Sequence, residues 1–119
     1  QANKVEKEEY QYYLYEAKCD TCSIIIALSS FGNGNPDLYI NYGDESLPTL
    51  RDNHISRSTL KSEVAIINLE NAFFYSRNIK SMRGRYIIGV YGREKSSYQI
   101  SITSENYPIT LISSGLAIQ

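Results

Sequence analysis

The chain has 119 residues, a formal net charge of −1 and 21% charged residues. That length suits one domain with a single core, and the balanced charge argues against a general nucleic-acid binder. No apolar run is long enough to span a bilayer, so we expect no direct membrane insertion. Eleven tyrosines and abundant isoleucine, with serine and asparagine between them, indicate β-strands joined by turns.

The first residues differ from the strand-like segment that follows them. Residues 1–9 alternate lysine and glutamate without an apolar face, which predicts an N-terminal linker. Residues 10–17 are predicted as the first strand, and two registers fit it, because a slip of one residue exchanges the two faces of a strand. The residues that point inward are Tyr13, Tyr15 and Ala17 in one register, and Tyr12 and Leu14 in the other.

The two cysteines, Cys19 and Cys22, stand three positions apart in a predicted turn. A local disulfide, two free thiols, half of a zinc site and a redox pair all fit this spacing. Zinc requires four ligands, and the single histidine, His54, cannot complete a site with one cysteine pair. A thioredoxin-type motif precedes a helix, whereas residues 23–29 have the pattern of a strand. A disulfide and two free thiols are therefore the main alternatives.

The strand predicted over residues 23–29 is apolar on both faces, which is typical of a central strand. A glycine-rich loop then leads into a third strand over residues 37–42. Successive side chains of a strand point to opposite faces, so Leu38 and Ile40 share the inward face and Tyr39 points outward.

Oxygen-bearing side chains gather in the loops before and after this third strand. Calcium prefers about six to eight oxygen ligands from carboxylates, amides and carbonyls. If the two loops meet at one end of the molecule, four side chains can supply several of them: Asn33, Asn35, Asp37 and Asp44. The alternative is ordinary turn chemistry, in which Asn and Asp bond to nearby backbone groups. We expect no cofactor other than such a calcium ion.

The middle of the chain, residues 49–62, is polar and weakly patterned, which predicts a long connection. Residues 63–69 are apolar and β-branched and are predicted as a strand. A helix over residues 60–74 also fits the spacing of the apolar residues and is the alternative.

The clearest strands lie near the C-terminus, at residues 85–92 and 97–103. The short polar segment between them, Gly92 to Ser96, predicts a turn that closes a β-hairpin. A last strand is expected at residues 109–112. Several short strands at regular spacing, with no crossover helices, predict an all-β, antiparallel sandwich.

Several short motifs stand in an order that resembles a known family. They are Tyr13-x-Tyr15, Ile24-x-Ile26-x-Leu28, Pro36-Asp37-Leu38-Tyr39-Ile40, Gly84-x-Tyr86 and Tyr98-x-Ile100-x-Ile102. In this order, over residues 10–104, they are similar to the bacterial pre-peptidase C-terminal (PPC) domains. Relatives of that family include the collagen-binding domains of clostridial collagenases.

The resemblance implies a jelly-roll-like β-sandwich of about eight strands without catalytic function. Some members of that family bind calcium, and some bind fibrous or polymeric ligands through tyrosines on one sheet face. In this chain Tyr39, Tyr42 and Tyr91 are the tyrosines that we expect on outward strand positions, so they are the candidate ligand contacts. The alternative is that they cover the second face of a sheet or pack under loops.

The residues do not predict an enzyme. His54 lies in a polar connection and the carboxylates lie in turns, so no base or acid pair is evident. We expect a non-catalytic binding or spacer module of a larger secreted or cell-surface protein, acting in adhesion or in presenting a ligand or substrate. Its expected partners are neighbouring domains of the same polypeptide and a protein or polysaccharide ligand, with no nucleic acid.

This expectation divides the chain into a module over residues 10–104 and a C-terminal strand and connector over residues 105–119. The alternative function is an intracellular structural β-sandwich subunit that packs in a protein assembly. The oxidation state of Cys19 and Cys22 distinguishes the two, because disulfides persist in oxidising compartments.

Overall fold

Alternating apolar and polar side chains make most of this chain β-strand. The structure, a computed structural model, describes residues 2–32, 34–43, 46–58 and 62–105. A short helix, α1 (Ala72–Ser76), lies between the sixth and seventh strands. In the described ranges no helix is long and apolar enough to cross a membrane. The strands are β1 (Ala2–Val5), β2 (Tyr10–Ala17), β3 (Ser23–Phe31), β4 (Pro36–Tyr42), β5 (Ile55–Ser58), β6 (Ser62–Ile67), β7 (Gly84–Gly92) and β8 (Ser96–Glu105).

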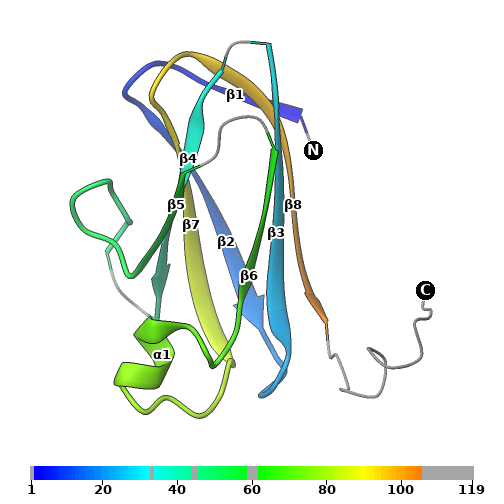
Figure 1. The fold of residues 1–119 in the computed structure, drawn as a ribbon, viewed down its shortest axis with the longest axis vertical. Helices are drawn as coiled ribbons and strands as arrows, with labels where there is room; N and C mark the ends of the chain where they lie inside the picture. The colour runs from blue at the N-terminus through cyan, green and yellow to red at the C-terminus, as the bar shows by residue number, and fades with distance from the viewer. Residues whose placement is uncertain (1, 33, 44–45, 59–61, 106–119) are drawn as a thin grey trace.

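Two antiparallel sheets of four strands face each other (Figure 1). Sheet A has the strand order β1-β8-β3-β6, and sheet B has the order β2-β7-β4-β5. This is the strand order of a jelly roll, in which two Greek keys wrap into a double sheet. The predicted all-β, antiparallel, jelly-roll-like sandwich of about eight strands is confirmed.

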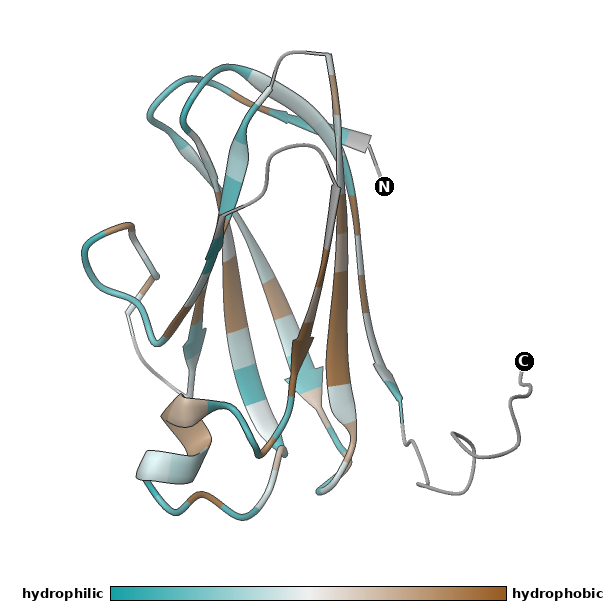
Figure 2. Ribbon diagram, viewed as in Figure 1, coloured by the Kyte–Doolittle hydropathy of each residue, from teal (hydrophilic) through white to brown (hydrophobic). Residues whose placement is uncertain are grey.

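The core lies between the sheets and takes every second residue of each long strand. Along β3 the side chains of Ile24, Ile26 and Leu28 are buried, and the residues between them are half-buried. Figure 2 shows the hydrophobic bands that this alternation produces along the strands of both sheets. In β2 the side chains of Tyr13, Tyr15 and Ala17 pack against the core, which decides between the two predicted registers.

Strands β7 and β8 do not form the predicted β-hairpin. β7 pairs with β2 and β4 in sheet B, whereas β8 pairs with β1 and β3 in sheet A, so the turn between them crosses from one sheet to the other. The backbone groups of Gly92 bond to Glu8 and Glu9, in the loop after β1, and not to β8. The period of two predicts each strand correctly, but it does not identify the partner of a strand.

Two other expectations differ from the structure, and a third cannot be compared with it. Residues 2–5, expected within a linker, form the edge strand β1, because Val5 is buried in the core and the backbone pairs with β8. The helix over residues 60–74 is wrong, since residues 62–67 form β6 and α1 begins only at Ala72. The last strand predicted at residues 109–112, and the connector after Glu105, lie outside the described residues.

Replacing Leu38 by alanine tests the assignment of the core. Leu38 on β4 is completely buried, whereas Leu14 on β2 is 64% exposed. We expect Leu38→Ala to lower the free energy of unfolding by about 2–5 kcal/mol, because it removes buried methyl groups and leaves a cavity. Leu14→Ala should change it by less than about 0.5 kcal/mol. Urea denaturation measures both values, and equal losses would contradict the assignment.

Buried tyrosines make stability fall at high pH. Tyr86 and Tyr98 are completely buried, and this burial raises the pKa of both hydroxyls above the usual value of 10.0. Their contribution to the free energy of unfolding is fully present below about pH 10. It is lost as the pH rises further, because the unfolded chain then binds fewer protons than the folded one. Urea denaturation between about pH 8 and 11 should show this fall, and a smaller fall for Tyr98→Phe. A free energy of unfolding that stays constant over this range would contradict the expectation.

Candidate functional site

Tyrosines gather on the outer face of sheet B, the face turned away from the core. There β7 lies between β2 and β4, and the register aligns their outward residues in rows across the three strands. We call these residues the tyrosine face. They are Tyr10, Tyr91 and Asp37 in the first row, Tyr12, Gly89 and Tyr39 in the second, and Leu14, Ile87 and Asn41 in the third.

The rings of this face contact one another. The ring centroids of Tyr10 and Tyr12 are 5.6 Å apart with the ring planes at 6°, and those of Tyr10 and Tyr91 are 4.8 Å apart. The Tyr12 ring lies over Gly89, where an added Cβ would come within 2.9 Å of a ring carbon. The absence of a side chain at Gly89 is therefore what lets this ring lie close to the sheet.

The segment between β4 and β5 is tied to the same face. The Tyr12 hydroxyl donates to the carbonyl of Pro48 at 2.9 Å, and the Tyr10 hydroxyl accepts from the backbone N–H of Leu50 at 3.0 Å. Pro48 is buried, whereas Leu47 and Leu50 on either side of it are 53% and 44% exposed. The tyrosine hydroxyls thus position two exposed leucines beside the tyrosine face.

Two of the three predicted ligand contacts lie on this face but are covered. Tyr39 and Tyr91 point outward as expected, yet only 6% and 9% of their surface is exposed. Tyr91 lies against Tyr10, and the ring centroids of Tyr39 and Tyr91 are 6.2 Å apart. Burial, and then the charge of Asp37, raises the pKa of the Tyr39 hydroxyl, so this hydroxyl stays protonated at neutral pH.

The outward placement of Tyr42 is wrong. Its ring packs against Tyr86 and Phe74, with ring centroids 4.9 and 5.1 Å away, and its hydroxyl donates to the carbonyl of Arg83 at 2.5 Å. Tyr42 lies an even number of residues from Leu38 and Ile40, so the period of two places it on their inward face. The sequence therefore carried the correct signal for this residue.

Asp37 is held by an arginine. Its side chain is 1% exposed, and the Arg93 guanidinium donates to Oδ2 and forms an ion pair with it. The other oxygen, Oδ1, has no hydrogen-bond partner among the described residues. The carboxylate raises the pKa of Arg93, which stays charged.

The described residues do not fit a calcium site. Asn35 and Gly43 lie at opposite ends of β4, a strand about 20 Å long, so these described residues of the two loops do not meet. Asp37 already has a cationic partner, and Asn33 and Asp44 lie outside the described residues. Within those ranges there is no group of three or more His, Cys, Asp or Glu residues that could hold a metal ion.

The single histidine is packed against the end of sheet B. The His54 ring stacks on Phe73 with centroids 4.2 Å apart, and Nδ1 accepts the backbone N–H of Tyr42 at 2.9 Å. Nδ1 is therefore engaged in holding the backbone at the end of β4. These contacts explain the position of His54 through packing.

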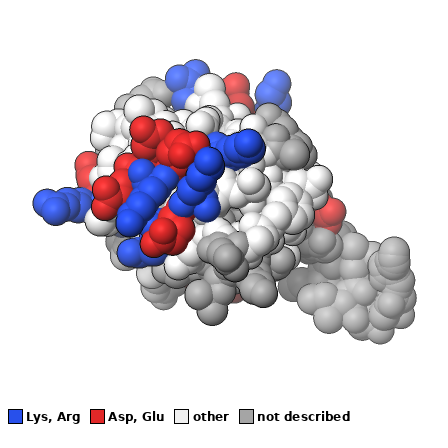
Figure 3. Space-filling view, turned by 90° about the horizontal axis from the view of Figure 1, so that it is seen from above, with Lys and Arg blue, Asp and Glu red and all other residues white. Residues whose placement is uncertain are grey.

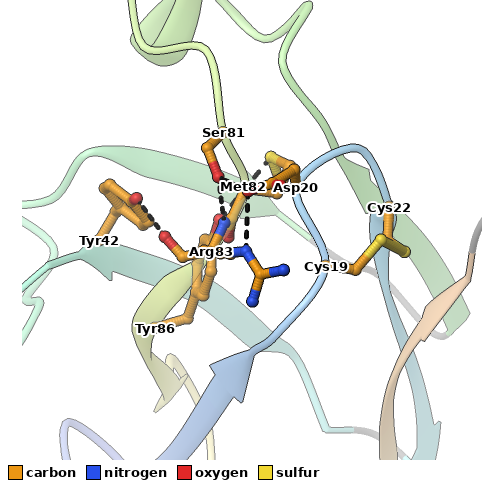
Figure 4. Close-up of polar contacts among 8 residues, drawn as sticks. All are labelled: Cys19, Asp20, Cys22, Tyr42, Ser81, Met82, Arg83 and Tyr86. Atoms are coloured by element: carbon orange, nitrogen blue, oxygen red, sulfur yellow. Dashed lines mark hydrogen bonds and ion pairs between the residues drawn. A yellow bond between two sulfur atoms is a disulfide. The ribbon is translucent and has the colours of Figure 1, made fainter.

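A disulfide joins Cys19 and Cys22 and shapes the turn between β2 and β3 (Figure 4). Within this turn the carboxylate of Asp20 accepts hydrogen bonds from Ser81 and Arg83 at 2.6 and 2.8 Å, which lowers its pKa. The carbonyl of Asp20 accepts the backbone N–H of Met82. The bridged turn therefore holds the segment before β7.

That segment in turn holds two core tyrosines. The carbonyl of Met82 accepts from the Tyr86 hydroxyl at 2.8 Å, and the carbonyl of Arg83 accepts from the Tyr42 hydroxyl (Figure 4). Hydrogen bonds therefore connect the turn that the disulfide closes, through Met82 and Arg83, to two tyrosines that pack against the core.

Exposed charges of both signs gather at the end of the sandwich where the β1–β2 loop meets the β7–β8 turn. Figure 3 shows them intermixed on one side of this end, with an uncharged surface beside them. Mixed signs produce no strong field of one sign, which a polyanion-binding surface requires. The residues are Glu6, Lys7, Glu8, Glu9, Arg93, Glu94 and Lys95.

The chain matches no model of a known protein family and no curated protein sequence. The sequence did not single out Leu14, Leu47 and Leu50 as surface residues of interest, although Leu14 points outward in one of the two registers of β2.

Opening the Cys19–Cys22 bridge should loosen this end of the molecule. We expect replacement of both cysteines by serine to lower the free energy of unfolding by about 2 kcal/mol, because the unfolded chain regains the freedom that a short closed loop removes. Amide exchange at Met82 should become faster, since its partner Asp20 lies inside the loop. An unchanged unfolding midpoint and unchanged exchange at Met82 would contradict this role.

Proposed function

We propose that this chain is a non-catalytic binding module of a larger secreted or cell-surface protein, and that its ligand binds beside the tyrosine face. One observation carries the proposal: Leu14, Leu47 and Leu50 expose 64%, 53% and 44% of their surface on the same side of the molecule as the rings of Tyr10 and Tyr12. Large apolar side chains that stay exposed together mark interaction sites, because their removal from water stabilises a complex.

An extended polymer is the ligand that this surface fits best. The Tyr12 ring lies on the sheet over Gly89, and the leucines lie beside it, so the surface is a platform built on a rigid sheet. Small molecules prefer concave sites that enclose most of their surface. A fibrous protein or a polysaccharide can instead lie along such a platform. Tyrosine suits this contact because it combines a flat apolar ring with a hydroxyl.

Tyr39 and Tyr91 then have a supporting role in ligand binding. Both lie beneath or beside groups that are more exposed, and neither offers much surface of its own. We place the direct contact on the exposed leucines and the half-buried rings of Tyr10 and Tyr12. Tyr91 keeps Tyr10 in position through the ring contact, and Tyr39 contributes through its own contact with Tyr91.

Two further features support the proposal. The sequence motifs resemble PPC domains, in which some members bind polymeric ligands through tyrosines on a sheet face, and a jelly-roll-like sandwich is compatible with that resemblance. The Cys19–Cys22 disulfide supports an extracellular location, since disulfides persist in oxidising compartments. The alternative of an intracellular structural subunit predicts reduced thiols at these positions.

Binding to immobilised polymers tests the proposal. Fibrillar collagen, cellulose and chitin are incubated with the wild-type chain, with Leu14→Asp and Leu50→Asp, and with the control Tyr75→Asp. Tyr75 is on α1 and is 80% exposed, so its replacement matches the others in exposure but lies away from the tyrosine face. We expect at least one polymer to bind, with about tenfold weaker binding of the two leucine variants, because a charge must be buried in their complexes.

Two results would overturn the proposal. One is that the wild-type chain binds none of the polymers. The other is that Tyr75→Asp weakens binding as much as the leucine variants do, which would place the ligand elsewhere.

A further inference from the structure

The outer face of sheet A is uncharged over its middle and differs from the tyrosine face. Strand β3 lies between β8 and β6, and the register aligns their outward residues in rows. We call the following residues the sheet A face. They are Ser97, Gln99, Ser101 and Thr103 on β8, Ile25, Ala27, Ser29 and Phe31 on β3, and Val64 and Ile66 on β6.

An apolar strip runs along one side of the sheet A face. Ala27 pairs with Val64, and Ile25 pairs with Ile66, so the four side chains lie together on neighbouring strands. Val64 and Ile66 are 59% and 49% exposed. β6 is also the outermost strand of sheet A, so no further strand of the described chain lies beyond it.

The two ends of the sheet A face carry opposite charges. At one end Lys4 on β1 pairs with Ser97, in the row of Phe31. At the other end Glu105 closes β8, in the row of Ser23. Phe31 and Ser23 are the two ends of β3, so the positive and negative charges are separated by the full length of this strand.

We propose that the sheet A face binds the same face of a second copy of this chain, with the strands of the two copies running in opposite directions. A two-fold axis that lies between the faces and crosses the strands produces this arrangement. It packs the apolar strip of one copy on that of the other. It also brings each Lys4 to the end of the interface that holds the partner's Glu105.

The charges select this arrangement over the other way of stacking the faces. In the other two-fold arrangement the axis lies along the strands, the two copies run in the same direction, and the apolar strip faces the β1 and β8 side of the partner. Both Lys4 residues then lie at one end of the interface, and both Glu105 residues lie at the other. Like charges placed together across an interface are unfavourable, and opposite charges favour the correct partner and orientation. The uncharged middle of the face has no charge to desolvate, so its burial is not opposed by that cost.

The sheet A face is small for a dimer interface. Its strands β1, β8, β3 and β6 have 4, 10, 9 and 6 residues, which at about 3.3 Å per residue and about 4.8 Å between strands gives roughly 460 Å² in projection. Stable interfaces bury about 800 Å² on each partner, so a weak, reversible dimer is expected. The dimer leaves both tyrosine faces on the outside, pointing away from each other. Such a dimer would bind polymers bivalently, one on each tyrosine face. The dimer itself does not depend on the proposed function.

Sedimentation equilibrium of the 119-residue chain at about 1 to 200 µM tests the dimer. The average mass should rise with concentration from the chain mass of 13.5 kDa toward twice that value. Val64→Lys should remain monomeric throughout, because it places a charge in the apolar strip. The control Leu14→Lys changes a residue of similar exposure on the other sheet and should dimerise like the wild type.

A wild-type chain that stays monomeric over this range would overturn the proposal. So would a Val64→Lys variant that dimerises like the wild type, or a loss of the dimer in Leu14→Lys alone. Circular dichroism of each variant shows whether it is folded, and the exposed positions of Val64 and Leu14 make folding the expected result.

An exchange of charges tests the orientation. Lys4→Glu and Glu105→Lys alone should each weaken the dimer about tenfold, because each places like charges together twice in the symmetric interface. The double variant Lys4→Glu/Glu105→Lys restores opposite charges and should dimerise as the wild type does. A double variant as weak as the single ones would contradict the antiparallel arrangement.

Discussion

The two sheets share one apolar core, and every long strand must direct one of its faces toward it. This constraint assigns each side chain of a strand either to the core or to an outer face. It explains why Leu38, Ile40 and Tyr42 point inward together, and why Tyr39 must point outward although it is largely apolar. A hydrogen bond also crosses the core at 2.6 Å, between the hydroxyls of Tyr13 on β2 and Tyr98 on β8. Both sheets therefore depend on the same contacts.

The outer faces have more freedom, and this chain uses them differently. On sheet B the outer face carries tyrosine rings that lie on the sheet, and the segment between β4 and β5 is hydrogen-bonded to the hydroxyls of two of these rings. On sheet A the residues of the sheet A face are uncharged: they are mostly serine, threonine and aliphatic side chains, with Gln99 and Phe31 among them, and Lys4 and Glu105 lie at its two ends. A rigid scaffold with two unlike faces is well suited to binding two different partners at once.

Much of the fold could be predicted from the sequence, because alternation is a local signal. The strands at residues 10–17, 23–29, 37–42 and 85–92 were all expected close to their observed bounds. The partner of a strand is not a local property, and so the turn after Gly92 was interpreted as a hairpin although it crosses between sheets. The edge strand β1 was missed because a single apolar residue, Val5, anchors it among charged neighbours.

The candidate site was predicted only in part. Tyr39 and Tyr91 lie on the outer face of sheet B, as their parity in the strands indicates. Tyr91 is covered by Tyr10, which comes from a distant part of the chain, and no local pattern reveals that cover. The exposed Leu47 and Leu50 owe their place to hydrogen bonds of Pro48 with Tyr12 and of Leu50 with Tyr10, across about forty residues of sequence.

The central claim is that the two outer faces bind different partners. Amide hydrogen exchange, measured at low and high protein concentration and with a saturating polymer, tests it most directly. Raising the concentration should slow exchange in β6 and the adjoining part of β3, and adding the polymer should slow exchange around Leu14 and residues 46–53. Protection by the polymer in β6, or by concentration around residues 46–53, would contradict the division between the faces.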